Sequence, residues 1–340
     1  MKHSLKGLFF LTLLLARFSA SAGTFATEYA LLSKLPTNSL SQLTGGGQPD
    51  EHGWVGAHRA NQTWYEAGMQ RGGCWYLIGG VVLGDVQRAE LAWTSIDTTF
   101  SHQLADGGFL SNPNPGRPHQ QSFDERVETA FFYLQELSHA ILVIRESPME
   151  PRFHDRIAAL EPKIDRAIAF VASGYDGIVR RSSKAANRIF IAAKAFGLCG
   201  EVLHKKEYLD LSDKLVAHAL TLRDKDGVFI ENGGRDSSYN AVSLLMGQVL
   251  GLHKPDEKLN EAMEKAMAWQ RTRILPTGEV EVKGNSRTGL KQERGMNGGY
   301  KGVNYHEVSL ALFYYSMIHD EPALGELAEK VGTWEARSKQ

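Results

Sequence analysis

A short turn sequence recurs along the chain: Asp106-Gly107-Gly108-Phe109, Asp176-Gly177-Ile178-Val179, Asp226-Gly227-Val228-Phe229 and Thr277-Gly278-Glu279-Val280. Successive copies begin 70, 50 and 51 residues apart, and the longest interval contains a Pro-rich insertion at 111–118. The underlying period is therefore about fifty residues, the length of one helical hairpin with its loops.

Two kinds of helical segment alternate between these turns. The segments before the turns are amphipathic, with apolar residues at three- and four-residue spacing, and lie at 86–104, 163–172, 213–222 and 257–271. The segments after the turns are more apolar and richer in small residues, and lie at 127–144, 189–203, 241–252 and 308–318. A segment at 64–83 has the same apolar character, despite its glycines. We predict outer helices from the first kind and fully buried inner helices from the second.

The alternation predicts an all-α fold: an α/α toroid, or incomplete barrel, of five to six helical hairpins around a central cleft, with short β-hairpins in the loops. The stretch GEVEVK at 278–283 is the main strand signal. An open α-solenoid is the alternative. Closure is favoured because the inner helices begin with polar, catalytic-looking residues at the same end.

The N-terminal residues have the pattern of a secretory signal peptide. Lys2 and Lys6 precede an apolar run at 8–16, and Ala20-Ser21-Ala22 is a small-x-small cleavage sequence. The apolar run is shorter than the roughly twenty residues that span a bilayer as a helix, so we expect no stable membrane insertion after cleavage. We therefore expect a signal peptide at 1–22, a single catalytic domain at 23–340, and a periplasmic or secreted protein.

The composition is that of an ordinary soluble globular protein, with 42% hydrophobic and 23% charged residues. The formal net charge of -1 becomes about -4 once the leader is removed, and so balanced a charge implies no nucleic-acid partner. Cys74 and Cys199 are the only cysteines and sit inside apolar helical patterns, so we expect two separate buried thiols rather than a disulfide. No cofactor and no metal site is expected.

Polar and aromatic residues gather where the inner helices begin. Trp64 and Tyr65 precede the first inner helix, where they could pack against sugar rings or belong to the core. His119 precedes the second inner helix, in a charged stretch typical of an acidic first helical turn. Asn187 and Arg188 begin the third. We take Trp64, Tyr65, His119 and Arg188 as candidate substrate-binding residues.

The fourth and fifth inner helices begin with the richest sets. Arg235 and Tyr239 are four residues apart and would share a helical face, while Asp236 or Ser237 could be the N-cap. The last inner helix follows a long glycine-bearing loop that looks like a substrate-binding lid. Its candidate residues are Arg287, Tyr300, Tyr305 and His306.

Two chemistries could use these residues. Removal of the proton at C5 of a uronic acid, with loss of the 4-O substituent, needs donors that neutralise the carboxylate, a base and an acid. Asn187, Arg188 and Arg235 could neutralise the carboxylate, and Tyr239, His306 or Tyr305 could move the protons. As base, Tyr239 would need a neighbouring cation, for which Arg235 is the candidate.

Glycoside hydrolysis instead needs two carboxylic acids about 5–10 Å apart. Asp106, Asp236, Glu66 and Glu307 are available. The Asp of a D-G turn usually serves the turn geometry, so elimination fits the set better.

At these positions the chain resembles polysaccharide lyases of the α/α-toroid class, which include alginate and glucuronan lyases. The resemblance is carried by the hairpin repeat and by three patterns: Ala186-Asn187-Arg188, Gly234-Arg235-Asp236-Ser237-Ser238-Tyr239 and Asn304-Tyr305-His306. It implies catalytic roles for Asn187, Arg235, Tyr239 and His306. The alginate-lyase pattern has His directly after the Asn, where this chain has Arg188, so the resemblance does not identify the base on that side.

The favoured hypothesis is a lyase that cleaves an acidic, uronate-containing polysaccharide by β-elimination. A glycoside hydrolase on the same scaffold, with Asp236 as the carboxylate to test, is the first alternative. A non-catalytic glycan-binding protein of an exopolysaccharide system is the second.

Overall fold

The computed structural model describes residues 27–56, 66–110, 121–294 and 299–338. The predicted leader at 1–22 and the candidates Trp64, Tyr65 and His119 lie outside the described residues. Export of the protein therefore stays a prediction.

Five inner and five outer helices alternate along the described chain, and each inner helix packs against the outer helix that follows it. The inner helices are α4 (Gly72–Leu83), α6 (Phe123–Arg145), α9 (Ala186–Leu203), α11 (Ser237–His253) and α13 (Tyr305–His319). The outer helices are α5 (Val86–Ser101), α7 (Glu150–Ser173), α10 (Lys206–Thr221), α12 (Glu257–Gln270) and α14 (Pro322–Ser338). The predicted all-α toroid is confirmed.

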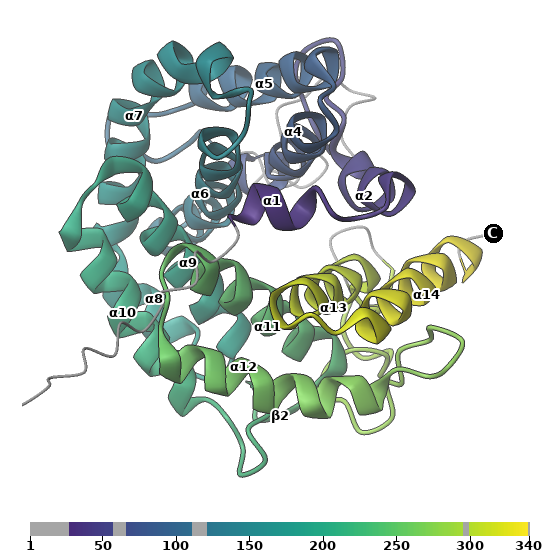
Figure 1. Ribbon diagram of the computed structural model, residues 1–340. Coiled ribbons are helices and arrows are strands. Elements are labelled where there is room, and N and C mark those ends of the chain that lie inside the picture. Colours follow the sequence, from purple (N-terminus) through teal and green to yellow (C-terminus); the bar gives the residue numbers. More distant parts are fainter. Residues whose placement is uncertain (1–26, 57–65, 111–120, 295–298, 339–340) are drawn as a thin grey trace, which may run out of the picture.

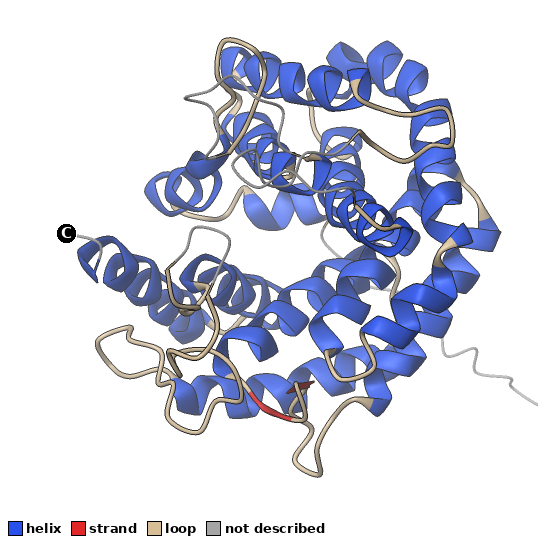
Figure 2. Ribbon diagram, turned by 180° about the vertical axis from the view of Figure 1, so that it is seen from behind, coloured by secondary structure: helices blue, strands red, loops and turns tan. Residues whose placement is uncertain are grey.

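The inner helices form an incomplete ring in the order α4, α6, α9, α11, α13, each packed against the next (Figure 1, Figure 2). The helix α2 (Thr37–Thr44) lies in the gap between the first and last hairpins, packed against α4 and α14. The Ser39 hydroxyl on α2 donates to the Glu329 carboxylate on α14 at 3.0 Å. The helix α2 thus connects the first and last hairpins across the open side of the ring. In an extended solenoid, the first and last hairpins would not come close to each other.

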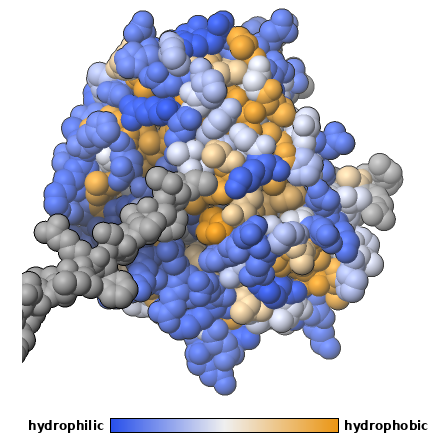
Figure 3. Space-filling view, in the orientation of Figure 1, coloured by the Kyte–Doolittle hydropathy of each residue, from blue (hydrophilic) through white to orange (hydrophobic). Residues whose placement is uncertain are grey.

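Burial separates the two helix classes as their sequences predict. In α9, 15 of 18 residues are buried, because other helices surround it on every side. In α10 only 5 of 16 are buried, on a single face that packs against α9. Figure 3 accordingly shows a largely hydrophilic surface around the periphery of the ring. The core therefore lies between the two helical layers, and the ring centre is left for polar groups.

Three copies of the recurring turn have the same structure. In each, an isolated antiparallel bridge joins residues six apart, namely Gln103 with Phe109, Arg223 with Phe229 and Ile274 with Val280. The turn glycines Gly107, Gly227 and Gly278 have φ values of 93°, 84° and 90°, where a side chain is unfavourable. A Cβ on Gly278 would meet a backbone oxygen of α14 at 2.1 Å. The glycine therefore serves both the turn and the close packing of the next outer helix.

The prediction of a turn at 176–179 is wrong, because these residues belong to the helix α8 (Tyr175–Arg181). Gly177 lies inside this helix and lets it approach α6, since a Cβ there would come within 2.6 Å of the Asp124 carboxylate. Arg180 forms an ion pair with the same carboxylate at 3.1 Å. The glycine is needed here for close packing and not for a positive φ.

The described strands are β1 (Ile230–Glu231) and β2 (Gly234–Arg235), which form one short antiparallel hairpin ahead of α11. The predicted strand at 278–283 is not formed, since only Val280 makes a bridge there. The remaining short helices are α1 (Glu28–Leu32), α3 (Ala67–Gln70), η1 (Gly45–Gly47) and η3 (Arg271–Arg273).

A buried ionic layer joins α1 to the inner helices, and consists of Glu28, Glu136, His139, Lys194, His253 and Tyr314. Glu28 contacts His139 Nε2 and His253 Nε2, each at 2.6 Å, and accepts a hydrogen bond from the Tyr314 hydroxyl. Glu136 Oε2 contacts His139 Nδ1 and Lys194 Nζ, each at 3.1 Å. Both nitrogens of His139 thus face carboxylates, the arrangement of a protonated imidazole. The layer ties the N-terminal helix to four elements of the ring.

Cys74 and Cys199 are separate buried thiols, as the sequence predicts. The Cys199 sulfur lies 3.1 Å from the Ser138 hydroxyl on α6. Among the described helices, none has both the length and the apolar character that crossing a membrane requires.

Candidate active site

The N-terminal ends of α9, α11 and α13 lie side by side at one end of the ring. An isolated bridge pairs Ala185, just before α9, with Glu231 of β1, and Asn304 N before α13 donates to Ser238 Oγ of α11 at 2.9 Å. Because α11 packs between α9 and α13, its first turn lies between theirs. The polar residues that begin these helices therefore converge, as the sequence predicts.

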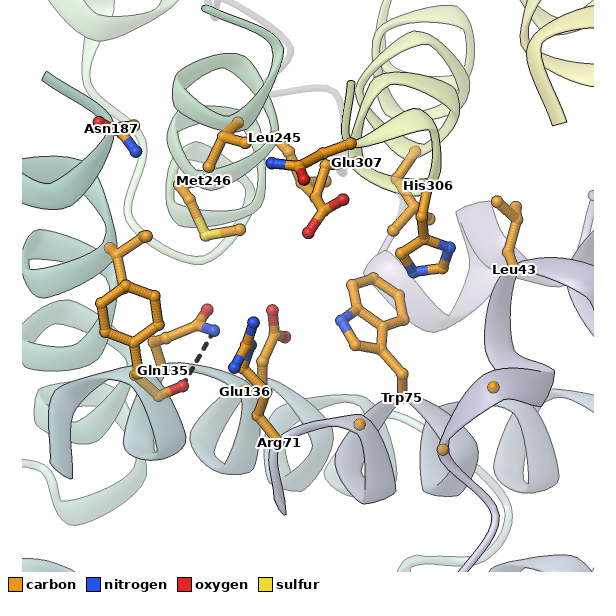
Figure 4. A pocket seen from close by; sticks show the side chains of 18 of the residues that line it. Leu43, Arg71, Trp75, Gln135, Glu136, Asn187, Leu245, Met246, His306 and Glu307 are labelled. Carbon is orange, nitrogen blue, oxygen red and sulfur yellow. Dashed lines mark hydrogen bonds between the residues drawn. The ribbon is translucent and has the colours of Figure 1, made fainter. Parts of the chain in front are cut away.

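A cavity of about 840 Å³ opens at this end of the ring. Its walls come from the inner helices, from the loop before α13, and from residues 42–47 of α2 and η1 on the open side of the ring. Figure 4 shows side chains from several of these elements pointing into it. Its polar lining residues include Arg71, Gln135, Glu136, Asn187, Arg188, Tyr239, Arg287, Lys301, His306 and Glu307. Three of the four predicted catalytic residues are among them.

Asn187 and Arg188 occupy the first turn of α9 at the cavity wall. Asn187 is only 5% exposed, and its Oδ1 has no hydrogen-bond partner within the described residues. A buried amide without partners is costly, so such groups point to a ligand or to bound water. Arg188 forms an ion pair with Glu128 of α6 at 3.3 Å while keeping 31% of its side chain exposed.

Two cations of the loop that precedes α13 lie close to the Tyr239 ring. Arg287 Cζ is 5.0 Å and Lys301 Nζ is 5.5 Å from the centre of its ring. Burial raises the pKa of Tyr239, and the charges of Lys301 and Arg287 only partly offset this effect. The hydroxyl therefore remains a phenol at neutral pH, able to donate a proton.

Glu293 holds both of these cations in place. Its carboxylate accepts hydrogen bonds from Arg287 at 2.6 and 2.7 Å and from Lys301 at 2.9 Å. The hydrogen bond from Arg287 is the main reason that the pKa of Glu293 falls to about 2. Arg287 also pairs with the buried Glu231. These contacts fix the loop over Tyr239 with its cations directed at the cavity wall.

His306 and Glu307 begin α13 and point into the cavity (Figure 4). The His306 ring meets Trp75 of α4 edge to face, with centroids 6.3 Å apart. Neither the His306 side chain nor the Glu307 side chain makes a hydrogen bond to another described residue. Both side chains are thus available to a ligand.

No family model and no curated protein matches this chain. Among solved structures, one described as "Polysaccharide Lyase BACCELL_00875" superposes with a TM-score of 0.51 at 12% identity, over 87% of this chain and 46% of that one. A second, described as "Crystal structure of sugar epimerase from ruminal bacterium", gives a TM-score of 0.47 at 11% identity over 85% and 87% of the two chains. The likeness to the lyase shows a shared fold. This chain spans less than half the length of that lyase.

Arg235 does not line the cavity. Its guanidinium forms ion pairs with Asp224 and Asp226 of the preceding turn and lies over the Trp269 ring, 5.8 Å from its centre. Arg235 belongs to β2, so the expected helical face shared with Tyr239 does not exist. The cations near Tyr239 are Arg287 and Lys301, and not Arg235 as predicted.

Tyr300 in the loop before α13 and Tyr305 at the start of α13 are not among the lining residues of the cavity. Tyr300 is 52% exposed, and Arg294 stacks on it with Cζ 4.6 Å from the ring centre. Tyr305 packs against the hydrophobic core and interacts with Trp334 of α14. Arg287, by contrast, lines the cavity as the sequence predicts for a substrate-binding residue.

Asp236 is the N-cap of α11 and is fully buried. Its carboxylate accepts hydrogen bonds from the backbone nitrogens of Ser238, Tyr239, Arg287 and Thr288, and from the Thr288 hydroxyl. A carboxylate bound in this way holds the loop onto the helix and has no capacity left for an acid or base role. The hydrolase alternative cannot rest on Asp236.

Sequence reasoning missed Gln135, Glu136 and Trp75, which line the inner part of the cavity. Gln135 and Glu136 lie in the middle of α6, and Trp75 lies in the first turn of α4, inside the apolar segment at 64–83. A usable signal was present, because Phe132, Gln135, Glu136 and His139 recur at the three- and four-residue spacing of one helical face within an otherwise apolar helix. No group of three or more His, Cys, Asp or Glu side chains within the described ranges could hold a metal ion.

Proposed function

We propose that this protein is a polysaccharide lyase that cleaves a uronic-acid-containing polysaccharide by β-elimination. The observation that carries the proposal is the position of Tyr239, on the helix start between those of Asn187 and His306, with Arg287 and Lys301 close to its ring. An amide, a phenol, an imidazole and two cations at one cavity wall supply each group that elimination needs.

The cations and Asn187 would neutralise the substrate carboxylate. Neutralisation stabilises the negative charge that develops on the carboxylate as the proton leaves C5. The electron pair of the C5–H bond then forms the C4=C5 double bond, and the C4–O bond breaks with its electrons leaving on the oxygen. That oxygen must receive a proton for the shortened chain to depart.

His306 and Tyr239 would move the two protons. Histidine commonly takes protons at neutral pH, and the ring of His306 has no hydrogen-bond partner among the described residues. Tyr239, whose pKa is raised by burial, would carry its proton at neutral pH and give it to the leaving oxygen. This assigns His306 as base and Tyr239 as acid.

The test is incubation with a panel of uronate polymers, following ultraviolet absorbance of the unsaturated product and the release of reducing ends. A lyase raises both signals together. Tyr239→Phe should abolish both while the far-ultraviolet circular dichroism and melting temperature stay near those of the wild type. Tyr208→Phe, on the outer helix α10, is the matched control and should remain active. An active Tyr239→Phe would remove this residue from the mechanism.

A glycoside hydrolase remains the second candidate because the Glu307 carboxylate points into the cavity and makes no hydrogen bond to another described residue (Figure 4). Rising reducing ends without ultraviolet absorbance would establish hydrolysis and overturn the lyase proposal. Neither signal, with retained glycan binding, would favour the non-catalytic glycan-binding role.

Export to the periplasm or the medium fits a polymeric substrate of this kind. N-terminal sequencing of the protein from culture fractions tests it, and residue 23 is the expected first residue.

A further inference from the structure

The inner part of the cavity differs in chemistry from its mouth. Trp75, Gln135 and Glu136 line it and are 8%, 2% and 3% exposed. They come from α4 and α6, and Glu136 joins this part of the cavity to the buried ionic layer. We call these three residues the inner subsite.

Gln135 presents an acceptor oxygen to the inner subsite. Its Nε2 donates to the Phe132 carbonyl at 3.3 Å, and since a carbonyl can only accept, the amide orientation is fixed. The Oε1 atom is then the one without a hydrogen-bond partner in the described structure, and Figure 4 shows the amide directed into the cavity. A buried acceptor without a partner calls for a donor from a ligand or from water.

Glu136 adds a second acceptor beside Gln135. Its hydrogen bonds with His139 and Lys194 both involve Oε2, which leaves Oε1 outside them. Burial by itself would raise the pKa of Glu136, but the charge of Lys194, the contacts with His139 and a hydrogen bond from the Gln135 side chain outweigh it and lower the pKa. The carboxylate is therefore ionised and accepts hydrogen bonds without donating any.

Three of the four arginines and lysines that line the cavity lie on α9 and on the loop before α13, namely Arg188, Arg287 and Lys301, and each keeps part of its side chain exposed. The fourth, Arg71 just before α4, donates to the Gly68 carbonyl at 2.5 Å and lies over the Phe132 ring, 5.5 Å from its centre. A carboxylate is therefore favoured at the mouth, where three cations gather, while the acceptor oxygens of Gln135 and Glu136 suit hydroxyl groups. Trp75 supplies an apolar ring on which the C–H face of a sugar could pack.

We propose that the inner subsite binds a neutral sugar ring through its hydroxyl groups, while the uronate ring occupies the cation-bearing mouth. A cavity of about 840 Å³ is in the range that holds drug-sized ligands, so it has room for more than one sugar ring. This inference rests on the proposed function, because it places the two rings of one glycan in one cavity. It specifies the substrate as a polymer in which a neutral sugar adjoins the uronic acid.

The test is binding of small glycosides, measured by isothermal titration calorimetry on the whole protein. The probes are the methyl glycosides of glucose, galactose and mannose, with methyl glucuronoside for comparison. At least one neutral glycoside should bind the wild type, and Gln135→Met should weaken it at least tenfold. Gln248→Met is the matched control, because Gln248 is also a buried glutamine with an unpartnered Oε1 but lies outside the cavity lining. It should bind the neutral glycoside as the wild type does.

Three results would overturn the inner subsite: no neutral glycoside binds, Gln135→Met binds as well as the wild type, or the two glutamine variants lose binding equally. If Gln135→Met does not fold, a crystal structure of the wild type with the bound glycoside decides, since a hydroxyl must lie within hydrogen-bond distance of Gln135 Oε1. These outcomes are separate from the lyase test. If a neutral glycoside binds in a way that depends on Gln135 but the protein shows no elimination activity, the inner subsite is supported and the lyase proposal is refuted.

Discussion

Replacing Glu28 by Gln should destabilise the whole ring, although Glu28 belongs to a helix of only five residues. Glu28 is 1% exposed and its carboxylate contacts side chains of α6, α11 and α13 through His139, His253 and Tyr314. Glutamine keeps the volume and one acceptor oxygen but removes the charge. All three contacts would then lose their anionic acceptor.

Each hydrogen bond to a charged group contributes about 1.5–3 kcal/mol, and breaking a buried ion pair costs about 3–5 kcal/mol. We therefore expect Glu28→Gln to lower the free energy of unfolding by about 3–5 kcal/mol at pH 6–7. Urea unfolding followed by circular dichroism measures this loss. Glu261→Gln, an exposed carboxylate on α12, is the matched control and should leave the urea midpoint unchanged.

The pH dependence adds a second readout. Burial would raise the pKa of Glu28, but the charge and hydrogen bonds of His139 and His253 outweigh it and hold the pKa well below its usual range. Its contribution to stability is therefore present above the unfolded carboxyl pKa and is lost as pH falls through the folded value. Burial would lower the pKa of His139, but the charge of Glu28 raises it overall, so this contribution is lost as pH rises through the raised value.

The difference in free energy of unfolding between the wild type and Glu28→Gln should therefore be largest at pH values between the folded pKa of Glu28 and that of His139. It should become smaller below the first value and above the second. A loss below about 1 kcal/mol at pH 6–7, or one independent of pH from 4 to 9, would refute the ionic account of this layer.

Three further predictions follow from single sites. Gly278→Ala should lower the free energy of unfolding by about 3 kcal/mol or more, and Gly284→Ala by about 1 kcal/mol. Both glycines have a positive φ, but only a Cβ at Gly278 would collide with backbone atoms. Equal urea midpoints for the two variants would contradict this. Asp236→Ala should lower the free energy of unfolding by about 3–5 kcal/mol. Asp256→Ala, which removes an N-cap that accepts a single hydrogen bond, should lower it by about 1 kcal/mol. Similar melting temperatures for the two variants would contradict this. The Cys199 thiol, whose pKa burial raises to about 12, should resist iodoacetamide until the protein unfolds, as mass spectrometry would show.

The architecture was predictable because it depends on periodic burial. Apolar residues at helical spacing mark the helices, and glycines held at positive φ mark the turns, so both signals are local in sequence. The same reasoning failed at Gly177, which is helical and small for the sake of contact with α6. A glycine required by packing and one required by backbone geometry look alike in a single sequence.

The site was predictable only in part, for a related reason. Asn187, Tyr239 and His306 converge because all inner helices begin at one end of the ring, a property of the fold. The cation beside Tyr239 could not be predicted, because it depends on how a loop folds back. Asp224 and Asp226 hold Arg235 away from Tyr239, while Glu293 holds Arg287 against it. Those ion pairs join residues whose proximity no local pattern reveals.

The same helical periodicity links the fold to the polarity of the cavity. The inner helices α6, α9, α11 and α13 run from the mouth toward the buried ionic layer, so residues three or four apart lie at successive depths along the inward face of each helix. On α9 this face carries Asn187 at the mouth and, seven residues later, Lys194 in the buried layer, paired with Glu136 of α6. Because Lys194 is fully buried and already paired, its charge is not offered to a ligand, and the acceptor oxygens of α6 define the inner subsite. In the proposed binding mode, the acidic ring of a glycan would stay at the mouth beside Arg287 and Lys301, while the neighbouring neutral ring would reach the acceptor oxygens of α6.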